Sequence, residues 1–66
     1  MHQGTVKWFD ESRGYGFIAP DEGGPDVFVH ATEVRKAALD LAEGDRVAFE
    51  IEKGRNGKPC AVRLQG

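Results

Sequence analysis

The 66-residue sequence has little of what stabilises or activates many small domains: one cysteine, one methionine and two histidines. A single cysteine, Cys60, cannot form an internal disulfide. Together with His2 and His30 it also lacks the ligand spacing of a zinc site. We therefore expect no metal and no cofactor. The domain must be stabilised by packing alone, near the lower size limit for doing so.

Long apolar runs are missing as well. No segment approaches the roughly 20 apolar residues of a membrane span, and the N-terminal residues lack the charged and apolar regions of a secretory signal. An unpaired cysteine without such a signal favours a reducing, cytoplasmic setting. We expect no membrane association.

Basic residues are in the minority, nine Lys and Arg against eleven Asp and Glu, for a net charge of −2. The charges are segregated along the chain. Residues 19–52 contain nine acidic and three basic residues, a net of −6, whereas residues 53–66 contain four basic residues and no acidic one. Because salt screens charges beyond about 10 Å, the local distribution matters more than the total. The acidic total therefore does not exclude a nucleic-acid ligand.

What the sequence does contain is a series of short strand-like segments separated by glycine-rich turns. The predicted strands cover residues 4–10, 15–19, 26–30, 46–53 and 59–64. Gly14, Pro20 and the pair Asn56-Gly57 mark turns or strand ends. Residues 31–41 show helical spacing, for which we expect one helical turn and then a long loop. This pattern predicts an all-β, five-stranded antiparallel barrel in a single domain of residues 1–66.

Alternation along the strands separates inward from outward side chains. The inward set is expected to comprise Ile18, Val27, Val29, Val47, Phe49, Ile51, Cys60, Val62 and Leu64. The first strand does not fit a simple pleat, because alternation places Val6 and Trp8 on one side. We expect Val6 inside and Trp8 outside, which requires a bulge or a strong bend.

The second and third strands turn their rings away from this core. The outward side chains there are Tyr15, Phe17, Phe28 and His30. A chain this short can cover one face of these strands with a core but hardly two. Exposed rings near Lys7, Trp8 and Arg13 are suited to stacking on the bases of single-stranded nucleic acid.

These segments resemble the cold-shock domain family. Residues 4–9 (GTVKWF) are similar to its opening strand, residues 14–18 (GYGFI) to its first ribonucleoprotein motif, and residues 27–30 (VFVH) to its second. Residues 41–50 resemble the approach to its fourth strand. The similarity covers almost the whole chain in the family's order. The RNA-recognition motif fold is excluded, since it needs two helices and places the second motif before the first.

The resemblance implies an oligonucleotide/oligosaccharide-binding (OB-fold) barrel that binds single-stranded RNA and single-stranded DNA with little sequence preference. Members of the family act in bacteria as RNA chaperones that melt weak secondary structure. They thereby affect transcription and translation, often during cold adaptation. We expect a monomer here, and a dimer formed by strand exchange stays open.

The resemblance also implies roles for particular side chains. The implied stacking platform is Trp8, Tyr15, Phe17, Phe28 and His30, with Phe9 at its edge. Phosphate contacts are implied for Lys7, Arg13, Arg55 and Lys58, and a hydrogen bond from a base edge for Asp26. Simpler alternatives stay open: half-buried support for Phe9, loop stabilisation for Asp26, and solvated hairpin charges for Arg55 and Lys58.

The chain departs from the family pattern at two positions. Ala31 follows His30, where bacterial members usually have an aromatic residue, and Leu39 replaces another exposed ring. One stacked base contributes roughly 1–3 kcal/mol, so a missing ring predicts an affinity about 5- to 150-fold lower. We expect a narrower platform, with tighter binding at Tyr15, Phe17 and Phe28 than at its far end.

Two other classes of function compete with nucleic-acid binding. Exposed rings can also bind a protein partner or a second copy of the chain, and insensitivity to salt would indicate that alternative. An enzyme is poorly supported, because Asp26 and His30 are the only possible catalytic pair on one strand face and no nucleophile accompanies them. We expect no catalytic activity.

Overall fold

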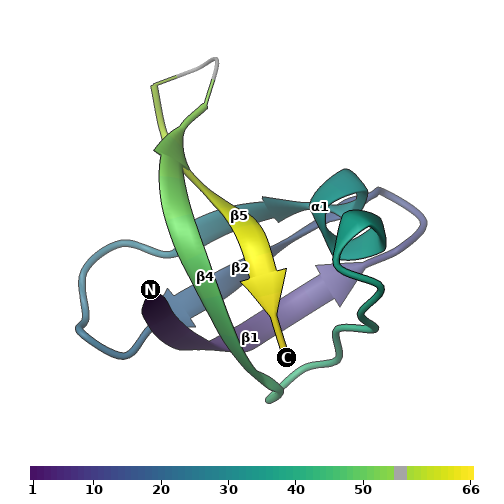
Figure 1. Cartoon of the computed structure of the whole chain (residues 1–66), viewed down its shortest axis with the longest axis horizontal. Helices are drawn as coiled ribbons and strands as arrows, with labels where there is room; N and C mark the ends of the chain where they lie inside the picture. Colours follow the sequence, from purple (N-terminus) through teal and green to yellow (C-terminus); the bar gives the residue numbers. More distant parts are fainter. Residues whose placement is uncertain (55–56) are drawn as a thin grey trace.

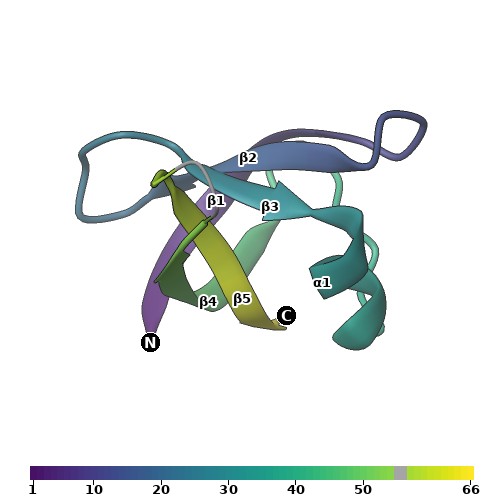
Figure 2. The same cartoon turned by 90° about the horizontal axis from the view of Figure 1, so that it is seen from above.

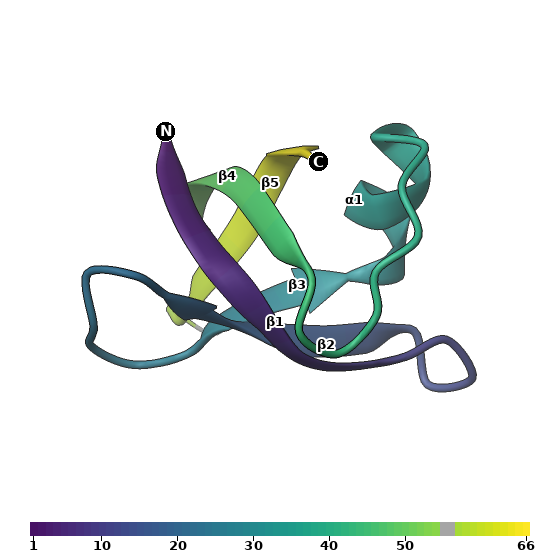
Figure 3. The ribbon, with the colours of Figure 1, turned by 90° about the horizontal axis from the view of Figure 1, so that it is seen from below.

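The computed structural model describes residues 1–54 and 57–66. Its elements are β1 (His2–Asp10), β2 (Tyr15–Pro20), β3 (Val27–His30), α1 (Ala31–Lys36), β4 (Arg46–Lys53) and β5 (Pro59–Gln65) (Figure 1). The strands close into a barrel in the order β1-β2-β3-β5-β4, which is seen from two opposite sides in Figures 2 and 3. The predicted all-β five-stranded barrel is confirmed. All its strand pairs are antiparallel except β3 and β5, which run parallel.

The barrel encloses a core of mostly aliphatic side chains around one phenylalanine. The buried hydrophobic residues are Val6, Ile18, Val27, Val29, Ala31, Val34, Val47, Phe49, Ala61 and Leu64. The first three strands therefore turn the predicted aliphatic side chains inward, which leaves the opposite face of β2 and β3 for their rings.

β1 contains the predicted bulge. Val6 pairs with Ile18 and Trp8 pairs with Phe17, so Lys7 is an extra residue on β1 and the register shifts there. The extra residue reverses the alternation. Val6 is 1% exposed in the core, whereas Trp8 is 39% exposed on the outside.

A second bulge, on β5, makes two of the predicted core positions wrong. Cys60 and Val62 are only partly buried, and Ala61 faces the core together with Leu64, which was predicted there. The register with β4 shifts over this segment, and Arg63 there has a φ of +50°, in the left-handed region. The extra residue puts Ala61 and Leu64, three positions apart, on the same side.

Ile51 on β4 is a third correction, because it is 37% exposed rather than buried. The C-terminal end of β4 extends beyond the remainder of the barrel (Figure 1). Alternation gave Ile51 the same side as Phe49, but the other strands do not reach far enough to cover it.

One short helix, α1, occurs among residues 1–54 and 57–66, and it lies at one end of the barrel (Figure 2). Ala31 and Val34 are its buried residues, and Ala37, Leu39 and Leu41 in the loop that follows pack partly against the core. The expected helical turn followed by a long loop is confirmed. In the two described stretches of the chain, no helix has both the length and the apolar character that crossing a membrane requires.

Candidate nucleic-acid interface

The strand registers bring rings from three strands together on the outer face of the barrel. Phe17 on β2 lies opposite Phe28 on β3, and Tyr15 lies opposite His30. The bulge in β1 places Trp8 opposite Phe17 on the other side. We call Trp8, Tyr15, Phe17, Phe28 and His30 the aromatic platform.

Each ring of the platform contacts at least one other. Tyr15 and Phe28 stack with centroids 5.6 Å apart and an angle of 19° between their planes. Phe17 meets Phe28 edge to face at 5.8 Å. Trp8 meets both Tyr15 and Phe17 edge to face, at 5.5 and 5.4 Å. Such contacts stabilise the rings in their free orientation, so a ligand that stacks on them orders little that was mobile.

The platform lies outside the core, as predicted. Tyr15, Phe17 and Phe28 are partly exposed, while the alternate residues of the same strands are buried valines and isoleucine. Apolar rings open to solvent on one face provide the flat surface on which a heterocycle can stack.

Phe9 is placed beneath the platform rather than on it. It is partly buried and packs against the core. It pairs with Gly16, and a Cβ added to Gly16 would come within 2.8 Å of the Phe9 ring and 2.4 Å of the Trp8 carbonyl oxygen. Glycine at position 16 therefore lets β1 approach β2 closely, and the geometry favours the supporting role for Phe9.

Two of the predicted phosphate-binding cations are paired with carboxylates beside the rings. Lys7 Nζ lies 3.0 Å from Asp26 Oδ2, and Arg13 Nε lies 3.6 Å from Asp10 Oδ2. The Tyr15 side chain beside Arg13, and then the Asp10 carboxylate, raise the pKa of Arg13. Like any arginine it is charged at neutral pH, and here that charge lies beside a ring of the platform.

A hollow of about 710 Å³ continues the platform on the side away from His30. Its lining comprises Phe17, Pro25, Asp26, Phe28, Lys58, Pro59 and Cys60. The hollow exists because β5 runs parallel to β3, with Cys60 opposite Phe28. Its size falls within the range of small-ligand sites. The sequence predicted no hollow, although four of its lining residues had been named as binding residues: Phe17, Asp26, Phe28 and Lys58. It missed both prolines and assigned Cys60 to the core.

His30 is the last ring at the opposite end of the platform. Ala31, next in the chain, is only 6% exposed, and Leu39 packs partly against the core. Neither position offers a ring, and the narrower platform expected from the sequence stays a prediction. Arg55, the remaining predicted contact, lies outside the described residues.

Other charged side chains form ion pairs elsewhere on the barrel. Arg46 binds Asp21 through two hydrogen bonds of 2.6 and 2.5 Å, which lower the pKa of Asp21. Arg63 binds Glu50 and Glu52 at 3.1 and 2.9 Å, and these bonds raise the pKa of Arg63. These two arginines thus contact carboxylates that neutralise them.

The two side chains considered as a catalytic pair contact different residues. Asp26 contacts Lys7, whereas His30 contacts Thr32. Within residues 1–54 and 57–66, no three His, Cys, Asp or Glu side chains are grouped to hold a metal ion.

Comparison with known proteins finds similarity to cold-shock proteins along nearly the whole chain. The family model described as 'Cold-shock' DNA-binding domain matches residues 2–66. The probable cold shock protein y4cH of Sinorhizobium fredii is 48% identical over 67 residues, which cover 98% of this chain and 97% of that protein. The cold shock-like protein CspC of Shigella flexneri is 51% identical over 63 residues, which cover 94% of this chain and 90% of that protein.

A plant protein matches over the same region. Glycine-rich protein 2 of Nicotiana sylvestris is 49% identical over 65 residues, 97% of this chain. The chain spans only 30% of that relative's length, in contrast to nearly all of the two bacterial proteins.

Proposed function

The chain belongs to the cold-shock domain family, and from this premise we propose that it binds single-stranded RNA and single-stranded DNA with little sequence specificity. The observation that carries the proposal is the aromatic platform, in which partly exposed rings from three strands contact one another. The family model, which describes a DNA-binding domain, supports nucleic acid as the ligand.

Stacking accounts for the low specificity. Every base has a flat π-face, so rings accept all of them, at roughly 1–3 kcal/mol per stacked base. Tyr15, Phe17 and Phe28 form the centre of the platform and would hold successive bases. In a duplex the bases stack on one another and their faces are not accessible to the platform. The platform therefore selects unpaired strands and not a particular base sequence.

Charged groups around the rings would hold the backbone of the strand. We assign phosphate contacts to Lys7, Arg13 and Lys58, and a hydrogen bond from a base edge to Asp26. Lys7 and Asp26 are paired in the free protein. An exposed ion pair is worth about 0–1 kcal/mol, so its partners can turn to the ligand at small cost.

Such binding would make the protein an RNA chaperone. A protein that binds the open strand and not the duplex shifts melting toward the open form by mass action, and no nucleotide hydrolysis is required. Through this shift the protein would influence transcription and translation in the cold, without catalysis. We expect it to act as a monomer in the cytoplasm.

A titration of oligo-dT and of mixed-sequence strands, followed by Trp8 fluorescence at two salt concentrations, tests the proposal. Trp8 contacts two other platform rings, so stacking should quench its emission. With about three phosphates neutralised, log affinity should fall with log salt at a slope near −2. The matching duplex is the control and should bind far more weakly.

The same titration distinguishes a protein-interaction barrel. A hydrophobic protein interface would be nearly independent of salt. Absence of quenching by any strand at micromolar protein would contradict nucleic-acid binding and favour that alternative.

A further inference from the structure

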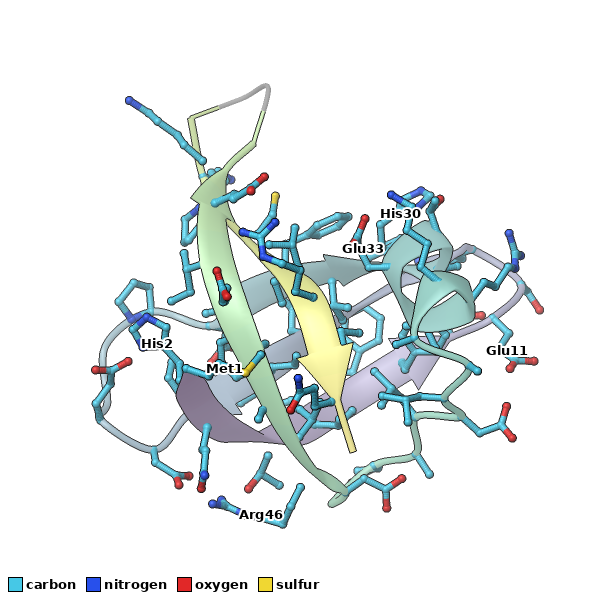
Figure 4. All side chains as sticks on the ribbon, viewed as in Figure 1. Met1, His2, Glu11, His30, Glu33 and Arg46 are labelled. Atoms are coloured by element: carbon cyan, nitrogen blue, oxygen red, sulfur yellow. The ribbon has the colours of Figure 1, made fainter. Side chains whose placement is uncertain are left out.

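His30 belongs to two structural elements at once. It is the last residue of β3 and the N-cap of α1, and Figure 4 shows it at the junction of the two. Its ring also ends the platform, 6.3 Å from the Phe28 ring with 39° between the planes. Helix caps are normally Ser, Thr, Asp or Asn, so a stacking ring that is also the cap is unusual.

The cap fixes which nitrogen of the imidazole carries hydrogen. The backbone N–H of Thr32 donates to His30 Nδ1 at 3.1 Å, and Thr32 Oγ1 lies 2.7 Å from the same nitrogen. A backbone N–H can only donate, so Nδ1 must present its lone pair. In the neutral ring the hydrogen is therefore on Nε2.

We propose that Thr32 is a positioning residue of the platform: its two contacts hold the His30 ring in one tautomer and one orientation for stacking on a base. This inference rests on the proposed function. It assigns a role to a residue that has no ring and no charge.

The surroundings of His30 explain why its ring needs the contacts with Thr32. At the centre of the platform, rings hold one another. At the end, Ala31 is buried and provides no neighbouring ring. The His30 side chain contacts Phe28 on one side and Thr32 on the other. A freely rotating ring would have to be ordered on binding, whereas a ring held by Thr32 is ordered beforehand.

The tautomer is tested in the free protein by two-bond ¹H–¹⁵N correlation spectra of the imidazole at neutral pH. The parent and Thr32→Ser, which keeps both donors, should show hydrogen on Nε2. Thr32→Val, which keeps the shape and the backbone N–H but loses the hydroxyl, leaves Nδ1 with one contact in place of two, so its spectra should show a larger share of hydrogen on Nδ1 than those of the parent. Hydrogen on Nδ1 in the parent would overturn the proposal.

Binding is tested by a double-mutant cycle with oligo-dT. Thr32→Val should weaken binding about 3-fold, as expected for loss of one hydrogen bond that orders a side chain, and Thr32→Ser should bind like the parent. In a His30→Ala background, Thr32→Val should have no further effect, because there is no ring to position. A loss of the same size in that background, or no loss in either, would overturn the proposal.

The two measurements separate this inference from the function on which it rests. If the parent binds no oligonucleotide, the proposed function fails and the stacking role fails with it, while the spectra still decide whether Thr32 sets the His30 tautomer. If the parent binds and the cycle shows no coupling, only the role of Thr32 fails.

Discussion

The centre of the aromatic platform and its end at His30 are built in different ways. At the centre, Tyr15, Phe17 and Phe28 come from two paired strands and hold one another through ring contacts. At the end, a single imidazole is held by hydrogen bonds to the first turn of a short helix. Neighbouring rings fix one another's orientation by contact. The orientation of a terminal ring is fixed in part by the polar group beside it. We therefore expect the centre to dominate affinity and the end to modulate it.

Removing the centre should have the largest effect. The double substitution Phe17→Ala, Phe28→Ala deletes two stacking surfaces, each worth roughly 1–3 kcal/mol, so oligo-dT affinity should fall by at least about 30-fold. Both rings lie outside the core, and circular dichroism should show that the barrel stays folded. Binding that survives in a folded variant would contradict the stacking mechanism.

Adding a ring at the His30 end of the platform should raise the affinity for oligonucleotides, by less than removal of the centre lowers it. Ala31→Phe adds a ring beside His30, and affinity for a strand long enough to reach it should rise about 5-fold, the lower limit for one stacked base. A short oligonucleotide that covers only the centre is the matched control and should show no gain. Because Ala31 is buried, thermal unfolding must accompany the titration. A loss of stability without tighter binding would show that position 31 cannot carry a stacking ring.

Charge beside the centre should affect the salt dependence more than the affinity. Lys7→Ala removes one phosphate contact, so the slope of log affinity against log salt should become shallower by about 0.7. Lys36→Ala is the control, since Lys36 lies on α1 and pairs with Glu33. The same slope change in both variants would mean that only net charge matters.

The smallest effect is expected away from the rings, at the ion pair of Asp21 with Arg46. Arg46 lowers the pKa of Asp21 in the folded protein, so the pair contributes stability above the unfolded pKa of about 4. That contribution is lost as the pH falls through the depressed folded value. Asp21→Asn should therefore lower the melting temperature slightly at pH 7, and the difference from the parent should shrink as the pH falls below about 4, as calorimetry can check. Oligonucleotide affinity at neutral pH should stay within about 2-fold, because exposed pairs act locally at ordinary salt.

The sequence predicted the centre of the platform well, because alternation along a strand is a local rule. Once Ile18, Val27 and Val29 are assigned to the core, the intervening Tyr15, Phe17 and Phe28 must face outward. The bulge in β1 could be predicted for the same reason, since Val6 and Trp8 needed opposite sides.

The sequence predicted the hollow and the end of β5 poorly, because both depend on contacts between distant strands. Cys60 and Val62 were assigned to the core by unbroken alternation, but a bulge near Arg63 shifts the pattern. The prolines of the hollow, Pro25 and Pro59, are brought together only by the parallel pairing of β3 with β5. Turn residues and periodicity contain no information on that pairing.

The sequence by itself determined the fold class, the family and the set of rings that face solvent, since these follow from the order of side chains along each strand. Only the tertiary structure decided which rings contact one another, where the platform ends, and that Thr32 bonds to the His30 ring. These features depend on register, strand closure and helix capping, in which residues distant in the chain, or on different elements, meet at distances that no local pattern specifies.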